Sequence, residues 1–247
     1  MTGIALALSW LTVLPVRSRG TIDRAAAGRA IAAVPLVGAL LGAVAAALLW
    51  ALTEAGLGAE LAGLLSVAAL ALLTRGMHID GLADTFDGLG CYGPPERAQE
   101  VMRSGGVGPF GVAALLVALL AQAFAFGALA ADGEWAAVVL AVAAGRVAVV
   151  LACRQGVAAF SDTGFGALVA GTQPLWRGVA WSALLVVAAT WVLQTPWQGP
   201  LVAVVAVAAS TLLAWHCARR FGGINGDVLG AVVEVTVTLT AVGLTIG

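Results

Sequence analysis

The chain has 247 residues, of which 61% are hydrophobic and 10% charged, with a formal net charge of −1 and a mean hydropathy of +1.02. These values exclude an ordinary soluble domain, and the net charge provides no bulk attraction for nucleic acid, so no nucleic-acid partner is expected. Apolar runs near the length of a bilayer-crossing helix alternate with short polar breaks. The sequence therefore predicts an all-α, polytopic integral membrane helical bundle that forms a single domain over residues 1–247.

The chain begins with an apolar stretch, residues 3–16, which at about 14 residues is short for a crossing. We predict a short re-entrant or interfacial helix there, with an eighth crossing as the alternative. A cleaved signal peptide is not expected, because no basic residue precedes the stretch and no small-residue cleavage pattern follows it. About seven transmembrane helices then follow, at residues 30–52, 57–73, 110–130, 135–153, 179–193, 201–215 and 228–246.

The arginines predict the orientation of these helices, because positive residues near the ends of crossings remain in the cytoplasm. All 12 basic residues are arginines, and eleven of them precede the first crossing or lie in every second break after it. The other breaks, such as residues 53–60 and 194–200, carry none. The side that we predict to face the cytoplasm is marked by Arg17, Arg19, Arg24, Arg29, Arg75, Arg97, Arg103, Arg154, Arg177, Arg219 and Arg220.

An acidic stretch, GMHIDGLADTFDGLG, covers residues 76–90 between the second and third crossings. Asp80, Asp84 and Asp87 stand at i, i+4 and i+7, within about 60° of one another around a helix. Like charges at this spacing repel, so a cation among them is expected, and oxygen ligands favour Mg²⁺, with Mn²⁺ as an alternative. The competing interpretation is a solvated helix end with incidental acids. His78 falls on the other side of such a helix, where it would cap, position the turn or contact substrate, with a role as a metal ligand as the alternative.

A second polar cluster, FGGINGDVLGAVVEV, covers residues 221–235. Asp227 and Glu234 share a helix face, with Glu234 about two turns deeper in the last crossing, where an ionisable group is usually functional. The turn that contains Asn225 and Gly226 would bring backbone N–H groups at a helix N-terminus close to a phosphate.

Three arginines fit the same chemistry, because carboxylates with a metal and guanidinium groups together would neutralise a phosphate or pyrophosphate substrate. They are Arg103 after the acidic stretch, Arg146 inside a crossing and Arg154 at the end of that crossing. The alternative for Arg154 is that it only marks the cytoplasmic end of the crossing and does not contact substrate. Arg146 needs a buried partner, and Glu234 is one candidate.

The cysteines show no C-x-x-C pairing, so reduced thiols without a metal or disulfide role are expected for Cys91, Cys153 and Cys217.

The segment HIDGLADTFDG resembles the H-x-D-G-L-x-D-x-x-D-G signature of the cobalamin synthase family, the adenosylcobinamide-GDP ribazoletransferases. Further similar segments are LTVLPV, VPLVGALLG, MRSGGVGPFG and GGINGDVLGA, so the resemblance covers nearly the whole chain. It implies an integral membrane transferase that joins alpha-ribazole, or its 5'-phosphate, to adenosylcobinamide-GDP with Mg²⁺. The products would be adenosylcobalamin, or its 5'-phosphate, and GMP.

The resemblance also implies roles for individual residues. Asp80, Asp84 and Asp87 would bind the metal, and one of them, for which we favour Asp87, would accept the hydroxyl proton. The enzyme would lie in the prokaryotic cytoplasmic membrane with its active site facing the cytoplasm, as a homo-oligomer or with other cobalamin-assembly enzymes. The residues that would support substrate or metal are His78, Arg103, Arg146, Arg154, Asn225, Gly226, Asp227 and Glu234.

The chain departs from the family pattern at Ser104 and Gly106, where an aspartate and a polar or basic residue are common, and at Asn225, where threonine is frequent.

The nearest rival to the function that the resemblance implies is a CDP-alcohol phosphatidyltransferase. Its D-G-x-x-A-R element is absent, because Leu82, Ala83 and Asp84 follow Asp80-Gly81. An ion-coupled transporter is a rival from another class. It would place its acids near the bilayer midplane between broken repeat helices, whereas the predicted acids cluster at one face.

Overall fold

The computed structural model describes residues 2–16 and 21–246, and the predicted topological residues Arg17 and Arg19 lie outside this part of the chain. The described residues contain eleven helices and no strand, so the all-α prediction is confirmed. The helices are α1 Gly3–Leu11, α2 Arg24–Glu54, α3 Ala59–Leu73, α4 Met77–Gly90, α5 Pro95–Arg103, α6 Pro109–Ala131, α7 Trp135–Ala152, α8 Gly164–Val169, α9 Leu175–Ala189, α10 Gln198–Phe221 and α11 Gly226–Leu244.

Each of the seven predicted crossings coincides with a helix, namely α2, α3, α6, α7, α9, α10 and α11. Five of these helices are long and apolar enough to cross a membrane alone, and the count reaches six if α3 and α4 form one broken span. The remaining helix, α9, is apolar but has only 15 residues. These lengths support a polytopic membrane protein and leave the seventh crossing a prediction.

The N-terminal helix α1 has nine residues and therefore extends about 14 Å, less than half of a bilayer core. The alternative of an eighth crossing is thus wrong. The helix packs along α2, and its last turn is bound by Arg75, whose guanidinium donates to the carbonyl of Trp10 at 2.7 Å. The short apolar segment therefore packs against the bundle through Leu6 and Ala7, which are buried beside α2.

Helices α2, α7 and α11 form the centre of the bundle, and small residues allow their backbones to approach closely. A Cβ atom at position 42 of α2 would lie 2.8 Å from the Cα of Val139 in α7. A Cβ atom at position 145 of α7 would lie 2.9 Å from the carbonyl oxygen of Val233 in α11. Glycine at these positions therefore fixes the spacing of the three central helices.

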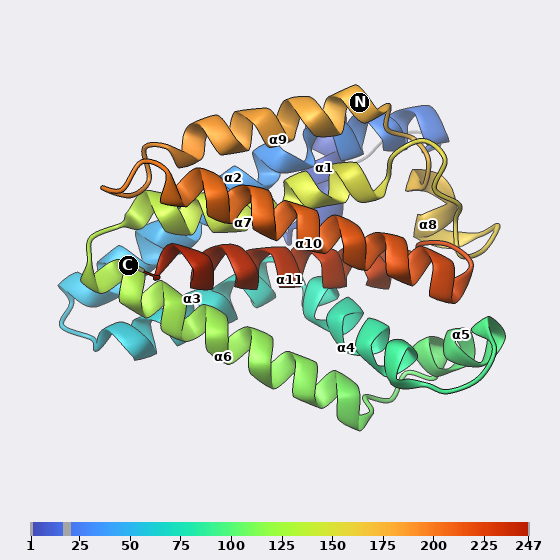
Figure 1. Ribbon diagram of the computed structural model, residues 1–247, viewed down its shortest axis with the longest axis horizontal. Coiled ribbons are helices and arrows are strands. Elements are labelled where there is room, and N and C mark those ends of the chain that lie inside the picture. Colours follow the sequence, from blue (N-terminus) through green and yellow to red (C-terminus); the bar gives the residue numbers. More distant parts are fainter. Residues whose placement is uncertain (1, 17–20, 247) are drawn as a thin grey trace.

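The acidic stretch forms the helix α4, as predicted. However, α4 does not follow a complete crossing through a loop at the membrane boundary. Helices α3 and α4 meet at a bend of 92° after a break of only three residues. Arg75 and Gly76 both have positive φ there, at 57° and 70°. The left-handed conformation ends α3, so α4 starts at a broken span or re-entrant turn near the middle of the bundle (Figure 1).

Apart from the α3–α4 bend, the breaks between the long helices lie toward two opposite ends of the bundle (Figure 1). The connections from α2 to α3, α6 to α7 and α9 to α10 lie toward the left in that view, and all three lack arginine. Helices α5 and α8 and the C-terminal end of α10 lie toward the right. Arg103 ends α5, and Arg219 lies in the last turn of α10. The predicted segregation of arginines thus has a counterpart in the fold, with the exception of Arg75, which lies at the α3–α4 bend and lines a cavity there.

Candidate functional site

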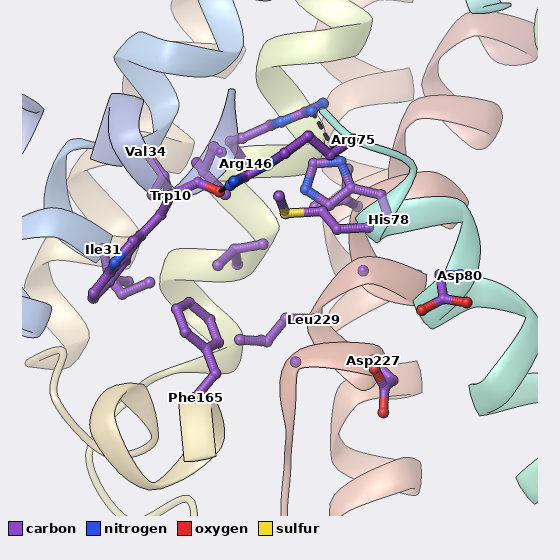
Figure 2. A pocket seen from close by; sticks show the side chains of 16 residues that line it. Trp10, Ile31, Val34, Arg75, His78, Asp80, Arg146, Phe165, Asp227 and Leu229 are labelled. Carbon is purple, nitrogen blue, oxygen red and sulfur yellow. Dashed lines mark hydrogen bonds between the residues drawn. The ribbon is translucent and has the colours of Figure 1, made fainter. Parts of the chain in front are cut away.

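A cavity of about 300 Å³ lies where α1, α2, α4, α7, α8 and α11 meet (Figure 2). Asp80 of α4 and Asp227 of α11 lie on one side of it, and the apolar side chains of Trp10, Ile31 and Phe165 lie on the other. Two elements far apart in the sequence, both singled out by their polar residues, therefore contribute to one site.

Close packing of α4 on α11 brings the two aspartates together. A Cβ atom at position 81 would lie 2.8 Å from the Cα of Asp227, and one at position 230 would lie 3.1 Å from the Cα of His78. Gly81 and Gly230 thus allow the two backbones to touch. Asp84 follows Asp80 by one turn of α4, and the negative charges of Asp227 and Asp80 act on its half-buried carboxylate.

The turn before α11 orients Asp227, and here the predicted helix N-terminus is confirmed. Asn225 is the N-cap residue, and its side-chain oxygen accepts from the backbone N–H of Val228 at 3.0 Å. Its Nδ2 donates to Oδ2 of Asp227 at 2.7 Å. Gly226, the first residue of α11, lines the cavity. One asparagine therefore caps the helix and holds the carboxylate.

Asp87 has a different environment from Asp80, although its charge still acts on Asp84 one turn before it. Its carboxylate is buried and accepts from the backbone N–H groups of Gly108 and Gly111, at 2.6 and 2.9 Å. These groups belong to the first turn of α6, which supplies donors that lack partners within the helix. Asp87 thus caps α6. Of the three aspartates in the motif, Asp80 lines the cavity, and Asp84 and Asp87 do not.

No three side chains of His, Cys, Asp or Glu converge on a metal-sized point in the described part of the chain. The three-aspartate arrangement predicted from helical periodicity is therefore not a preformed cage. Mg²⁺ does not require one, because it commonly binds through one or two carboxylates together with substrate phosphates and water. The oxygen donors of Asp80 and Asp227, which line the cavity, suit that mode of binding, and Asp84 lies one turn further along α4. Zinc would favour nitrogen or sulfur ligands.

His78 lies in the first turn of α4 and is buried against α7 and α11. Its Nδ1 is 3.4 Å from Nη2 of Arg146, and both residues line the cavity. The sequence prediction that His78 faces away from a metal between the aspartates is consistent with this position. His78 links the broken segment to the central helix α7.

Arg146 and Glu234, the predicted intramembrane pair, form no ion pair in the structure. The Glu234 carboxylate accepts instead from Nε2 of Gln122 at 2.8 Å, and Gln122 also donates to Thr238 at 3.0 Å. Nε of Arg146 is buried without a protein partner, and both Arg146 and Glu234 line a second cavity of about 20 Å³. That volume suits one water molecule with several polar neighbours.

Arg103 and Arg154 do not line the cavity that contains Asp80. Arg103 ends α5, where it is exposed and stacks over the ring of Phe160 at 5.1 Å. Arg154 lines another cavity, of about 260 Å³, together with Arg219 and Trp215. The departures from the family pattern at residues 104 and 106 lie in the exposed segment after α5.

The structure adds site residues that sequence reasoning missed. Trp10 lies in an apolar segment, and Phe165 follows the short polar run of residues 161–163, and neither segment matches a binding motif that would mark an aromatic residue. Arg75 was assigned only to topology, although the strong turn signal of Gly76 follows it. Gln122 was detectable as a lone polar residue inside a predicted crossing.

The three cysteines are free thiols, with Cys153 and Cys217 buried and Cys91 half-buried. None of them lines the cavity of Asp80.

Comparison with known proteins gives concordant results. Residues 3–245 match the family described as cobalamin-5-phosphate synthase. An adenosylcobinamide-GDP ribazoletransferase of Corynebacterium efficiens is 38% identical over 97% of this chain and 90% of its own length. A protein of the same name from Corynebacterium diphtheriae is 35% identical over 99% of this chain and 92% of its own length. Another, from Klebsiella pneumoniae, is 38% identical over 93% of this chain and 93% of its own length. No solved structure matches the chain.

Proposed function

Because this chain belongs to the cobalamin-5-phosphate synthase family, we propose that it is an adenosylcobinamide-GDP ribazoletransferase. It transfers the adenosylcobinamide phosphate moiety of adenosylcobinamide-GDP to alpha-ribazole or its 5'-phosphate. The products are adenosylcobalamin, or its 5'-phosphate, and GMP. The observation that carries this proposal is similarity to ribazoletransferases over nearly the whole chain, including the acidic stretch of α4. A CDP-alcohol phosphotransferase or an ion-coupled transporter finds no such support.

The reaction is a displacement at phosphorus. A ribose hydroxyl oxygen forms a bond to the cobinamide-side phosphorus, the bond from that phosphorus to the bridging oxygen breaks, and GMP leaves. The hydroxyl proton needs an acceptor within hydrogen-bond reach. Asp80 and Asp227 are suited to this role because both line the cavity, whereas Asp87 is occupied by α6. This replaces Asp87, which the sequence alone favoured, as the proposed base.

The reaction also develops negative charge on the diphosphate. We propose that Asp80, Asp84 and Asp227 hold Mg²⁺ together with the substrate diphosphate, with Mn²⁺ as a substitute. When bound, the ion would neutralise charge on the phosphoryl oxygens. Exposed Arg103 is available to the diphosphate from the α5 side, and the N-terminus of α11 at Gly226 offers backbone donors. Arg146 and His78 support the cavity wall.

We propose further that the enzyme lies in the prokaryotic cytoplasmic membrane with this site open to the cytoplasm. The arginine-bearing end of the bundle supports that orientation. A homo-oligomer, or association with other enzymes of cobalamin assembly, stays a prediction from the family.

The direct test uses the purified full-length chain in liposomes, supplied with adenosylcobinamide-GDP, alpha-ribazole and Mg²⁺. We expect GMP release that is lost on addition of EDTA and restored by excess Mg²⁺. Asp84→Asn should reduce the rate strongly, because it removes one of the proposed metal-binding carboxylates. Wild-type protein that releases no GMP would exclude the activity, and release that persists in EDTA would exclude the metal requirement.

A further inference from the structure

We infer that the apolar half of the cavity is the subsite for the aromatic base of the ribazole substrate, with Trp10 and Phe165 as its specificity-determining residues. This inference rests on the proposed function and adds to it, because it assigns the smaller of the two substrates to a defined place. The ligand class is a nucleoside with a planar, apolar heteroaromatic base.

The size of the cavity selects between the two substrates. Its volume of about 300 Å³ lies at the small end of the range for ligand pockets. A nucleoside has a suitable size for this space. Adenosylcobinamide-GDP carries a corrin macrocycle, an adenosyl group and a guanine nucleotide, and it is far too large to enter. The larger substrate must therefore approach from outside, where Asp80 is exposed.

The chemistry of the apolar half suits a flat aromatic ring. Trp10 and Phe165 are half-buried and meet edge to face, with ring centroids 5.1 Å apart and an interplanar angle of 77°. Ile31 and Val34 of α2 and Leu229 of α11 complete this half (Figure 2). Apart from the indole N–H of Trp10, these side chains carry no hydrogen-bonding atom. Aromatic faces bind bases largely through stacking and burial.

Both aromatic residues are held in place by arginines that bind backbone carbonyls. Arg75 donates to the carbonyl of Trp10 at 2.7 Å. Arg24, in the first turn of α2, donates to the carbonyls of Ala167 and Ala170 and so fixes α8, which carries Phe165. A wall ordered before the ligand arrives reduces the entropy that binding costs.

The aromatic wall directly adjoins the acidic side of the cavity. A Cβ atom at position 226 would lie 3.8 Å from Cδ1 of Phe165, and residue 226 immediately precedes Asp227. A base against Phe165 and Trp10 therefore places its ribose beside Asp227 and Asp80. This orientation points a ribose hydroxyl toward the carboxylates and toward the diphosphate that arrives from outside.

The same wall predicts base selectivity. An apolar benzimidazole loses few hydrogen bonds on entering it, whereas a purine with an exocyclic amine would leave polar atoms unpaired. The alpha-riboside of adenine should therefore bind at least about tenfold more weakly than alpha-ribazole.

Binding without turnover provides the test. Purified protein in lipid nanodiscs is titrated with alpha-ribazole alone, without adenosylcobinamide-GDP or Mg²⁺. We expect Trp10→Ala and Phe165→Ala to weaken binding about tenfold to a hundredfold, and Trp10→Phe to weaken it less. Matched controls are Trp191→Ala and Phe124→Ala, which remove exposed aromatic side chains outside the cavity and should leave binding unchanged.

Steady-state kinetics then separate the two substrates. In the GMP-release assay, the Trp10→Phe and Phe165→Leu variants should raise KM for alpha-ribazole and leave KM for adenosylcobinamide-GDP unchanged. The inference is overturned if only KM for adenosylcobinamide-GDP rises, or if the alanine variants bind alpha-ribazole as wild type does while wild type releases GMP. Wild-type protein that binds alpha-ribazole through Trp10 and Phe165 but releases no GMP would instead overturn the proposed activity and leave the binding site standing.

Discussion

At the scale of single residues, the carboxylates of the acidic motif differ in the groups that they contact. Asp80 lies at the cavity with Asp227, whereas Asp87, two turns further along α4, is buried against the N-terminus of α6. The backbone donors of α6 provide a fixed, charge-complementary site for the Asp87 carboxylate. The contacts thus place Asp87 in the packing of α6 and leave Asp80 at the cavity, where the proposed chemistry requires a carboxylate.

Replacement of Asp80 or Asp227 by asparagine tests the chemical role. We expect either variant to lose about a hundredfold or more in kcat, because a proton acceptor or charge-stabilising group disappears. The thermal midpoint should not fall for Asp80→Asn, since Asp80 is exposed and the change removes a like charge from the acidic cluster. Asp162→Asn, at an exposed acid outside the cavity, is the control. Full activity in both variants would contradict the assignment.

Replacement of Asp87 by asparagine tests the structural role. An amide retains one acceptor oxygen and presents an NH₂ group to the other backbone donor, so we expect a loss of about 1–2 kcal/mol in stability. The measurement is the thermal midpoint in detergent, with kcat determined below it. A midpoint equal to wild type, combined with a hundredfold or larger loss of kcat, would restore Asp87 as a catalytic group.

At the scale of helices, the contact between α4 and α11 builds the site. Gly81 and Gly230 let the two backbones touch, and the turn at Arg75 and Gly76 directs α4 across α11. A continuous α3–α4 helix could not bend by 92° toward its partner. The broken span therefore converts a sequence motif into one wall of a cavity.

Gly81→Ala should disrupt that contact. The added Cβ would lie 2.7 Å from the carbonyl oxygen of Asp227, and backbone atoms cannot move aside as a flexible side chain can. We expect a loss of about 1–3 kcal/mol in stability, although alanine has the higher helix propensity. The thermal midpoint and GMP release should both fall. Gly106→Ala, at a position with no atom within 4 Å, is the control and should match wild type.

At the scale of the whole molecule, the two ends of the bundle differ in charge, and the cavity is built near the centre. Helices α2, α7 and α11 provide the rigid middle on which α1, α4 and α8 close the site. The arginine-bearing segments gather toward the end of the bundle that contains α5 and α8. The direction from which substrates arrive depends on which end faces the cytoplasm.

Cysteine labelling can test that direction. In a Cys91→Ser background, where the other two thiols are buried, single cysteines replace exposed Glu96 in α5 or exposed Ala55 after α2. A membrane-impermeant maleimide should label position 96 only in inverted vesicles and position 55 only in intact spheroplasts. The reverse pattern would place the arginine-bearing end outside the cell.

The sequence by itself determined where the helices run and which family the chain belongs to. Apolar runs near 20 residues must satisfy their backbone hydrogen bonds as helices in a bilayer, and the prediction of each run was confirmed as a helix. The acidic motif and its helical form were likewise readable, as was the helix N-terminus near Asn225 and Gly226, whereas the capping role of Asn225 came from the structure.

Only the tertiary structure decided which polar groups meet. Helical periodicity gives the direction of a side chain around its own axis, but it does not specify the neighbouring helix. For that reason it grouped Asp87 with Asp80, paired Arg146 with Glu234, and offered no sign of Trp10 or Phe165. The positive φ angles at Arg75 and Gly76, and the close approach of α4 to α11 at Gly81, supplied the missing placement. These contacts join segments more than a hundred residues apart, and local sequence does not encode such distances.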